Sequence, residues 1–407
     1  MKINIDRLKE NIIELGWIGF AGYEDKELPI GDKGITRFPY SDNYQKAEEL
    51  VRDYMKEAGL ETFKDPIGNL FGMLPAKNQD DEMIITGSHI DTVIKGGLFD
   101  GSLGVLAAVE CLQVLKENGY QSNHKLVAAV FNGEAGVKYP PYLGSRAFIG
   151  DKFSYDELGQ IKAARLGEAE LEASTVNTSR IKNFLELHIE QGQVLEEMGK
   201  SIGVVNGIVG IARYRATTTG RANHSGTTPM ELRDDALIKA SRIILELEKT
   251  VKELNKDGGR MVATVGDLKV KSGAVNIIPE EVKFLIEIRD MEKANIDKVL
   301  KTVEDLDIKG LEIKETYYEE STYLNKAVQQ EIAAAAESLG YDYMDILSGS
   351  GHHAGPMAGV TPTGMIFVPS KDGISHNPDE WTDWEDIKKG ANVLLETIKR
   401  LDKPKEV

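Results

Sequence analysis

The alternation of apolar and polar positions predicts a layered protein. Apolar residues recur at helical spacing in four stretches, at 5–15, 46–58, 103–116 and 384–400. Short apolar runs typical of buried strands lie between them, at 83–86, 125–131, 184–187 and 364–368. Strands that alternate with helices in this way favour an α/β domain whose sheet is buried between helices. The passage over 16–44 shows no clear periodicity and predicts a long functional or mobile loop.

The middle of the chain has a different order of elements. From about 212 to 325 it predicts a strand, a helix at 236–254, two strands, a helix at 294–305 and a last strand. This βαββαβ order suits a small open-faced sheet with two helices on one side, a ferredoxin-like α+β domain. We therefore predict an inserted domain at 212–325, inside a first domain that comprises 1–211 and 326–407.

Composition narrows the possible partners. The 407 residues include 49 Lys and Arg against 66 Asp and Glu, which gives a formal net charge of −17. Nucleic acids and anionic membranes require a basic face, so the balance argues against both as general partners, although it leaves room for a local basic pocket. The N-terminus lacks the apolar run of a signal peptide, and no stretch approaches the ~18–20 apolar residues of a membrane span. We expect a cytoplasmic protein.

Cysteine contributes little to the expected chemistry. Cys111 is the only cysteine and lies in an apolar helical stretch, which favours a buried, inert thiol over a nucleophile. A single cysteine excludes an internal disulfide framework and zinc sites made of several thiolates.

Histidines and carboxylates follow the predicted strands at the points where these end. They are His89, Asp91, Glu134, His188 and His376, with Asp100 after the glycine-rich turn at 95–101. The carboxyl ends of the strands in an α/β sheet gather at one edge, so these side chains are expected to converge. Three imidazoles with carboxylates suit a borderline metal ion such as Zn²⁺ or Mn²⁺. The sequence therefore predicts a metal site at this edge.

Seven sequence blocks in a fixed order carry a resemblance to one family. They are GSHIDTV at 87–93, GLFDG at 97–101, LHIEQG at 187–192, HSGTTPM at 224–230, NIIP at 276–279, GMIFVPS at 364–370 and ISHNP at 374–378. On these blocks the chain resembles, nearly end to end, the carbamoylase branch of the aminoacylase/carboxypeptidase-type metallohydrolases. This branch of dinuclear-metal amidohydrolases includes N-carbamoyl-L-amino-acid hydrolase, allantoate amidohydrolase and β-ureidopropionase. The resemblance implies a mixed sheet between helices in the catalytic, metal-binding domain and a homodimer formed through the inserted dimerisation or lid domain.

The resemblance also implies a ligand set for two divalent metal ions. Asp100 would bridge both ions, His89 and His188 would complete one site, and His376 would hold the other ion. Asp91 would orient His89 from behind. Two such ions lower the pKa of water and polarise a carbonyl group.

The remaining functional residues are also implied by the resemblance. Glu134 would be the general base that takes a proton from the attacking water. Arg289 would grip the carboxylate of the substrate, because a guanidinium binds a carboxylate through two hydrogen bonds. His224, on the inserted domain, would reach a site across the dimer and support the developing oxyanion. Substrate contacts would come from Gln191, Asn276 and His352.

Several of these residues have simpler interpretations. Arg289 would also fit a surface ion pair, Asn276 a turn residue before Pro279, and Gln191 the plain end of a strand.

The chain departs from the family pattern at several positions. The family carries Phe-x-x-Glu-Glu-Gly, whose second Glu is a metal ligand, whereas this sequence reads FNGEAG at 131–136. Ala135 offers no ligand atom, so the second metal site would be weakened and the chain would hold one or two ions. His353 stands where the family has Asp, which opens a possible replacement ligand, and Glu287 stands for the usual Asp near Arg289.

These observations lead to one functional hypothesis and two rivals. The first is a metal-dependent amidohydrolase that cleaves the C–N bond of a carbamoyl or ureido group on a small carboxylate, with allantoate, N-carbamoyl-α-amino acids and N-carbamoyl-β-alanine as candidate substrates. The second is an N-acyl amino-acid hydrolase or peptidase on the same scaffold. The third is a catalytically degenerate relative that binds a small molecule or forms a dimer, for which Ala135 is the argument. His and carboxylate ligands accept Zn²⁺ and Mn²⁺, and also Co²⁺ and Ni²⁺.

Overall fold

The chain divides into two compact units. The computed structural model describes residues 1–21, 28–29, 33–77, 82–134, 136, 138–271 and 273–403. The first unit comprises Met1–Asn206 and Tyr323–Val407, and the second comprises Gly207–Thr322. Each unit has its own hydrophobic core.

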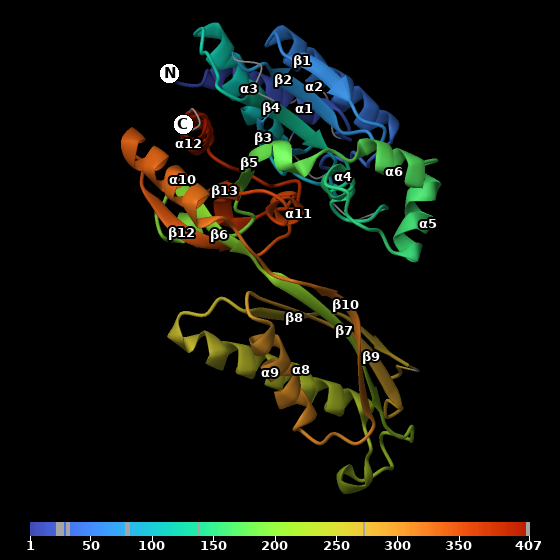
Figure 1. Ribbon diagram of the computed structural model, residues 1–407. Coiled ribbons are helices and arrows are strands. Elements are labelled where there is room, and N and C mark those ends of the chain that lie inside the picture. Colours follow the sequence, from blue (N-terminus) through green and yellow to red (C-terminus); the bar gives the residue numbers. More distant parts are fainter. Residues whose placement is uncertain are drawn as a thin grey trace. The chain divides into compact units, whose positions relative to one another are not determined.

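A mixed sheet runs through the first unit (Figure 1). Over the described residues it has nine strands in the order β1-β2-β4-β3-β5-β13-β6-β11, and β12 pairs with β6. The central strands β4, β3, β5 and β13 are parallel, whereas β1, β2 and β6 pair antiparallel with their neighbours. The strands are β1 Glu61–Lys64, β2 Leu70–Leu74, β3 Met83–His89, β4 Lys125–Phe131, β5 Ile181–Ile189, β6 Ile202–Ile208, β11 Thr322–Tyr323, β12 Tyr343–Ser348 and β13 Thr363–Val368.

Helices cover both faces of this sheet. The helices α1, α2, α3, α10 and α12 share the main apolar core with alternate strand residues, whereas α4 packs on β4, and α11 packs on β5 and β13. The central helix α3 is buried along almost its whole length, which explains its nearly unbroken apolar sequence. The helices are α1 Ile5–Trp17, α2 Asp42–Glu57, α3 Ser102–Glu117, α4 Leu143–Phe148, α5 Tyr155–Ala163, α6 Glu168–Ser174, α7 Val194–Glu197, α10 Lys326–Leu339, α11 Ala354–Ala358 and α12 Trp384–Leu401. The predicted α/β architecture with a mixed sheet is confirmed.

The second unit has the predicted βαββαβ order. Its sheet has the order β10-β7-β9-β8, and all of its pairings are antiparallel. Apolar residues of α8 and α9 pack with the sheet in a separate core. The elements are β7 Gly210–Thr219, α8 Ala236–Leu254, β8 Val262–Val270, β9 Glu281–Asp290, α9 Lys293–Glu304 and β10 Leu311–Glu319.

Two further sequence observations concern the helices. No helix among the described residues is both long enough and apolar enough to cross a membrane. Cys111 lies fully buried in α3, and this burial raises the pKa of its thiol well above the ordinary value. A buried thiol with a raised pKa is unreactive, in agreement with the prediction.

The parallel strands bring distant residues to one edge of the sheet. His89 is the last residue of β3, and His188 is the last but one of β5. In the strand register His89 pairs with Phe131, which ends β4, and His188 pairs with Phe367 of β13. Residues that follow β4 and β13 therefore start from the same edge as the two histidines.

Candidate metal centre

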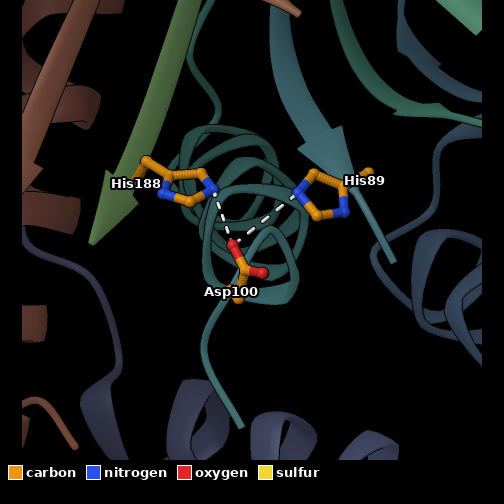
Figure 2. A group of neighbouring side chains, drawn as sticks. All are labelled: His89, Asp100 and His188. Atoms are coloured by element: carbon orange, nitrogen blue, oxygen red, sulfur yellow. Dashed lines mark ion pairs between the residues drawn. The ribbon is translucent and has the colours of Figure 1, made fainter. Parts of the chain in front are cut away.

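His89, Asp100 and His188 form a buried cluster whose ligand atoms all lie within 4.8 Å of one another. Figure 2 shows the two imidazole rings turned toward the Asp100 carboxylate. Nε2 of His188 lies 3.4 Å from Oδ1 of Asp100, and Nε2 of His89 lies 3.9 Å from the same oxygen. Imidazole nitrogens and carboxylate oxygens are ligand atoms that bind Zn²⁺ and Mn²⁺.

Hydrogen bonds set the tautomer of both histidines. Nδ1 of His89 lies 2.9 Å from the carbonyl oxygen of Asp91, and Nδ1 of His188 lies 2.9 Å from that of Ile189. A carbonyl oxygen only accepts, so each Nδ1 carries the proton and each Nε2 presents its lone pair toward Asp100. Burial also lowers the pKa of His188 to about 4, which keeps its ring neutral. The cluster thus fits a divalent metal ion in both geometry and protonation.

Gly101 is required for this arrangement. Its φ of +67° is a left-handed conformation, and a Cβ at this position would lie 2.4 Å from the His89 ring. Its N–H donates to Nε2 of His188 over 3.2 Å, which agrees with a lone pair on that nitrogen. The glycine in the GLFDG block therefore lets the backbone pass close under both rings.

His376 and Gln191 approach Asp100 from the other side. Nε2 of His376 lies 3.5 Å from Oδ2 of Asp100, and its side chain is 54% exposed. Nε2 of Gln191 donates to Oδ1 of Asp100 over 3.2 Å and lies 3.3 Å from Nε2 of His376. Both residues have positive φ, +60° for Gln191 and +52° for His376, a strained backbone that often marks functional positions. Ala135, which stands where the family has a metal-ligand Glu, lies outside the described residues.

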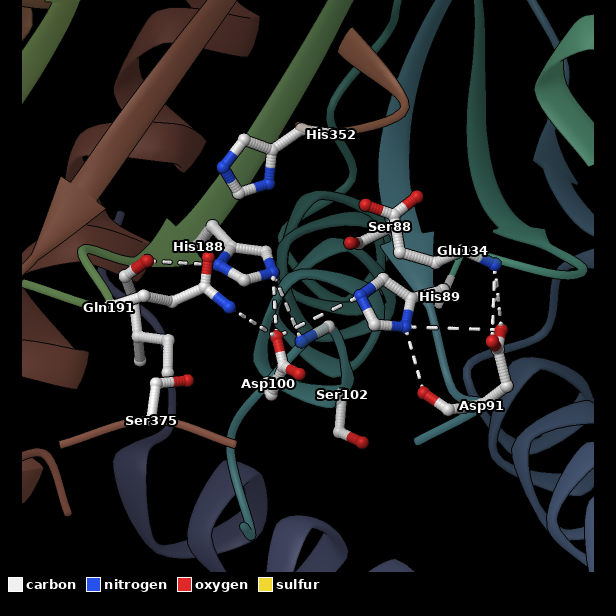
Figure 3. A network of polar contacts seen from close by, with 12 residues as sticks. Ser88, His89, Asp91, Asp100, Ser102, Glu134, His188, Gln191, His352 and Ser375 are labelled. Atoms are coloured by element: carbon white, nitrogen blue, oxygen red, sulfur yellow. Dashed lines mark hydrogen bonds and ion pairs between the residues drawn. The ribbon is translucent and has the colours of Figure 1, made fainter. Parts of the chain in front are cut away.

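Asp91 contacts the site differently from what the resemblance implies. Its main-chain carbonyl makes the hydrogen bond to His89, whereas its carboxylate Oδ1 lies 3.9 Å from Nδ1 of that ring. The carboxylate instead accepts from the N–H of Gly133 over 3.1 Å. It also accepts from the N–H of Glu134 over 3.1 Å (Figure 3). Asp91 therefore fixes the backbone that carries Glu134.

The adjacent His352 and His353 serve two different parts of the site. The His352 ring lies edge-on to His188, with centroids 4.6 Å apart, and its Nε2 lies 2.9 Å from Oγ of Ser348. Nε2 of His353 lies 3.3 Å from Oε2 of Glu134. Burial lowers the pKa of both rings well below the ordinary value, so both are neutral.

Two buried glutamates support the site, and sequence reasoning missed both. Oε1 of Glu380 accepts from the N–H of Phe99 over 2.8 Å and from that of Asp100 over 3.0 Å, and its Oε2 accepts from the Ser375 hydroxyl over 2.9 Å. Glu380 thus ties the Asp100 turn to the segment that carries His376. Burial and the nearby Asp100 charge raise its pKa.

Glu186 lies deeper in the sheet. It accepts from the Ser88 hydroxyl over 2.7 Å and from the N–H of Ala354 over 2.8 Å. Burial raises its pKa to about 7. A charged residue inside the apolar strand Phe184–Leu187 was the available sequence signal for Glu186, whereas Glu380 offered only its place four residues after His376.

A buried arginine lies behind the site. Arg37 is 1% exposed and donates through Nε to the carbonyl of Ile90, and through its terminal nitrogens to the carbonyls of Leu15 and Ile18 and to Oγ of Ser102. The distances from its nitrogens to these oxygens are 2.7–3.1 Å. Burial lowers its pKa to about 10, which still leaves it charged at neutral pH. Arg37 therefore connects the C-terminal end of α1 to the residue that follows β3 and to the first residue of α3.

Arg289 in the second unit is paired with an acidic neighbour. Its Nε and Nη2 lie 2.8 Å and 2.6 Å from Oε1 of Glu287, whose Oε2 accepts from Nε of Arg213 over 2.7 Å. Partial burial alone raises the pKa of Glu287, but the hydrogen bonds from Arg213 and Arg289 lower it overall. The pair holds the guanidinium in one orientation on the sheet.

His224 and Asn276 lie on neighbouring exposed loops of the second unit. Residues His224 and Ile277 form an isolated β-bridge, and the N–H of Ser225 donates to the carbonyl of Asn276 over 3.0 Å. The N–H of Gly226 donates to Nδ1 of His224 over 3.0 Å. In the neutral ring the proton therefore lies on Nε2, which leaves that atom as a donor.

The structure thus gathers most of the predicted site residues in the first unit. Those around Asp100 are His89, Asp91, Glu134, His188, Gln191, His352 and His376. The other three, His224, Asn276 and Arg289, belong to the second unit.

Comparisons with known proteins identify the family. The model of Peptidase family M20/M25/M40 matches residues 85–400. An N-carbamoyl-L-amino acid amidohydrolase of Geobacillus stearothermophilus is 36% identical, with 97% of this chain and 98% of that protein covered. An allantoate amidohydrolase of Escherichia coli K12 is 34% identical, with 93% and 94% covered. The crystal structure of a hydantoinase/carbamoylase family amidase from Burkholderia multivorans has a TM-score of 0.87 at 31% identity and covers 99% of both chains.

The chain belongs to Peptidase family M20/M25/M40. It is a hydrolase of that family, and the predicted resemblance to carbamoylases and allantoate amidohydrolases is confirmed.

Proposed function

We propose that this protein is a metal-dependent amidohydrolase that cleaves the C–N bond of a carbamoyl or ureido group on a small carboxylate. The observation that carries the proposal is the convergence of the Nε2 atoms of His89 and His188 on the Asp100 carboxylate. The names of its relatives, N-carbamoyl-L-amino acid amidohydrolase and allantoate amidohydrolase, support the substrate class.

The metal would be Zn²⁺ or Mn²⁺. His89, Asp100 and His188 would hold one ion, and Oδ2 of Asp100 with His376 would hold a second ion more weakly, because Ala135 supplies no ligand. Lewis acidity, which polarises a carbonyl and makes water more acidic, is the chemistry that a divalent cation supplies at such a site.

Glu134 would move the proton. Its carboxylate takes a proton from the attacking water and later gives it to the leaving nitrogen, as a general base and then a general acid. The hydrogen bonds from its N–H to Asp91 keep its backbone in place during both transfers. The main role of Asp91 is therefore to position the base.

Arg289 would bind the substrate carboxylate. Its guanidinium is preoriented by Glu287, and a guanidinium can bind a carboxylate through two hydrogen bonds. Gln191, Asn276 and His352 would add polar contacts. His224 would support the developing oxyanion through its Nε2 proton.

We also propose a cytoplasmic homodimer formed through the second unit. Its edge strand β8 exposes Val262 and Leu268, and the neighbouring β9 exposes Leu285. An edge strand with exposed apolar side chains favours pairing with a second copy. His224 would then act in a site of the partner subunit.

A substrate screen tests the activity. The protein, loaded with Mn²⁺ or Zn²⁺, is incubated with allantoate, N-carbamoyl-α-amino acids and N-carbamoyl-β-alanine, and ammonia is measured. We expect ammonia release from at least one of them and none after treatment with a chelator. Hydrolysis of N-acyl amino acids or peptides without ammonia release would favour the second hypothesis. No hydrolysis of any of these compounds, by protein that has bound metal, would favour the degenerate relative.

A further inference from the structure

His353 is a fully buried ring that faces Glu134. It is 0% exposed, and its Nε2 lies 3.3 Å from Oε2 of Glu134. The ring lies among Phe131, His89 and Tyr142, with centroid distances of 5.0, 6.0 and 6.2 Å. Packing on several sides prevents the imidazole from turning away, so the contact with Glu134 is a fixed feature of the fold.

The other ring nitrogen of His353 is held by Ser145. Oγ of Ser145 lies 2.7 Å from Nδ1 of His353 and 3.3 Å from the carbonyl oxygen of Tyr142. The hydroxyl has a single proton, for which the Tyr142 carbonyl and Nδ1 of His353 compete. The much shorter contact with Nδ1 takes it, so Nδ1 is the acceptor and the ring proton lies on Nε2. An ionised carboxylate accepts hydrogen bonds only, so this tautomer matches the group that Nε2 faces.

The backbone of His353 is also fixed. The residue is the N-cap of α11, and its carbonyl accepts from the N–H of Met357 over 3.2 Å. The next N–H, of Ala354, donates to Glu186, which is bound in turn by Ser88 on β3. The ring is therefore positioned by the same strands that position the metal-site histidines.

We propose that His353 is a positioning residue. The proton on Nε2 of His353 directs Oε2 of Glu134. The proposal rests on the function of Glu134 as the general base. Asp91 fixes the backbone of Glu134, and His353 fixes its carboxylate. Within the described part of the chain the buried Nε2 of His353 has no hydrogen-bond partner, and it lies 3.3 Å from Oε2 of Glu134. Catalytic contacts often tighten when substrate is bound, and we expect this one to do so.

A matched pair of variants distinguishes the contribution of Nδ1 of His353 from that of Nε2. His353→Asn keeps a polar group near Nδ1 but does not reach Glu134, whereas His353→Gln places an amide donor near Nε2. We expect His353→Asn to lower kcat about 10- to 100-fold, the value of one charge-assisted hydrogen bond, with KM changed less than about twofold. His353→Gln should stay within about fivefold of the wild-type kcat. An equal loss in both variants, or wild-type kcat in His353→Asn, would overturn the proposal.

Metal content distinguishes positioning from ligation. We expect both variants to bind as much Mn²⁺ or Zn²⁺ per chain as the wild type, measured by elemental analysis after desalting. Loss of one ion in both variants would make His353 a metal ligand and would overturn the positioning role.

The contact between His353 and Glu134 can also be tested without substrate, independently of the proposed function. Thermal unfolding is measured for the wild type, Glu134→Ala, His353→Asn and the double variant, all loaded with metal. We expect the fall in Tm of the double variant to be smaller than the sum of the single falls, because both single changes remove the same contact. If the wild type hydrolyses no carbamoyl compound, the proposed function fails and this cycle alone decides. Additive falls would then overturn the contact between His353 and Glu134.

Discussion

The carboxylate of Asp91 accepts the main-chain N–H of Glu134 over 3.1 Å, and this contact joins the end of β3 to the segment that follows β4. The ring of His89 donates its hydrogen bond from Nδ1 to the carbonyl oxygen of Asp91 instead. One residue thus serves two neighbours: its backbone orients the ring of His89, and its side chain positions Glu134, the proposed general base.

Asp91→Asn separates these two roles. An amide replaces one acceptor oxygen with an NH₂ donor. If Oδ1 is the oxygen that remains, the N–H of Glu134 keeps only its longer 3.3 Å contact and loses the 3.1 Å contact with Oδ2, where it then faces a donor. We expect kcat to fall about tenfold or more while the affinity for metal stays near that of the wild type. Steady-state kinetics and competition with a chelator measure the two quantities. A large loss of metal affinity with little change in kcat would show that the carboxylate orients His89.

The metal centre predicts an unequal response to loss of its histidines. His188→Ala removes a ligand from the buried cluster and should abolish tight binding of its ion, whereas His376→Ala should leave one tightly bound ion. His224→Ala, which changes an exposed histidine of the second unit, is the control and should retain the wild-type content. Elemental analysis after loading and desalting gives the ions per chain. Equal losses in His188→Ala and His376→Ala would contradict the unequal strength of the two sites.

Glu186 predicts a pH dependence of stability. Burial raises its pKa in the folded protein to about 7, from an ordinary value of 4.5. The folded state therefore holds the proton more tightly than the unfolded state, and the associated stability is fully present below pH 4.5 and lost as pH rises through 7. The difference corresponds to about 3 kcal/mol.

Glu186→Gln tests this dependence in metal-free protein. A glutamine has a fixed acceptor for the N–H of Ala354 and a fixed donor for the hydroxyl of Ser88. Between pH 5 and pH 8 we expect the Tm of the wild type to fall more than that of the variant. Parallel Tm curves would show that Glu186 does not titrate over this range.

Arg289 predicts a specific loss of substrate binding. Arg289→Ala should raise KM for a carboxylate substrate about 10- to 100-fold and should have little effect on the corresponding uncharged amide. Arg213→Ala is the matched control, because Arg213 pairs with the same Glu287 from the neighbouring strand. Kinetics with both substrates measure the effect. If KM for the amide rises by the same factor, Arg289 does not act by binding the substrate carboxylate.

Mixed dimers test whether His224 acts across subunits. Glu134→Gln and His224→Ala should each be nearly inactive alone. When both chains are co-expressed and the mixed dimer is purified by two different tags, one of its two sites contains an intact Glu134 and an intact His224 from the other chain. We expect about half of the wild-type activity per mixed dimer. An inactive mixed dimer, or an active monomer in sedimentation, would exclude the trans role.

The sequence predicted the elements with strong patterns and their order. The helix expected over 46–58 begins earlier, at Asp42, because Ser41 caps it through a hydrogen bond from the N–H of Tyr44. The strand expected over 184–187 extends to Ile181–Ile189, because polar residues at its start also join the ladder. Short helices such as α4 and α11 carry too few residues for a periodic signal, and packing against the sheet determines them.

The candidate site was predictable where residues follow strands. The ends of β3 and β5 explain why His89 and His188 meet. Glu380 was not predictable, because two of the groups it accepts from, the N–H groups of Phe99 and Asp100, lie about 280 residues away along the chain. His353 appeared in the sequence only as a departure from a family pattern, and its contacts with Ser145 and Glu134 depend on the packing of α11.

The contacts of Arg37 couple the folding of α1 to that of the sheet edge at which His89 and His188 lie. A buried guanidinium that stays charged needs acceptors, and the four acceptors of Arg37 come from the C-terminal end of α1, from Ile90 after β3 and from the start of α3. Docking any one of these segments without the others would leave a buried charge unsatisfied. The N-terminal helix and the metal-binding edge should therefore form and unravel in a single cooperative step, and a protease cut between α1 and Arg37 should inactivate the enzyme as a whole.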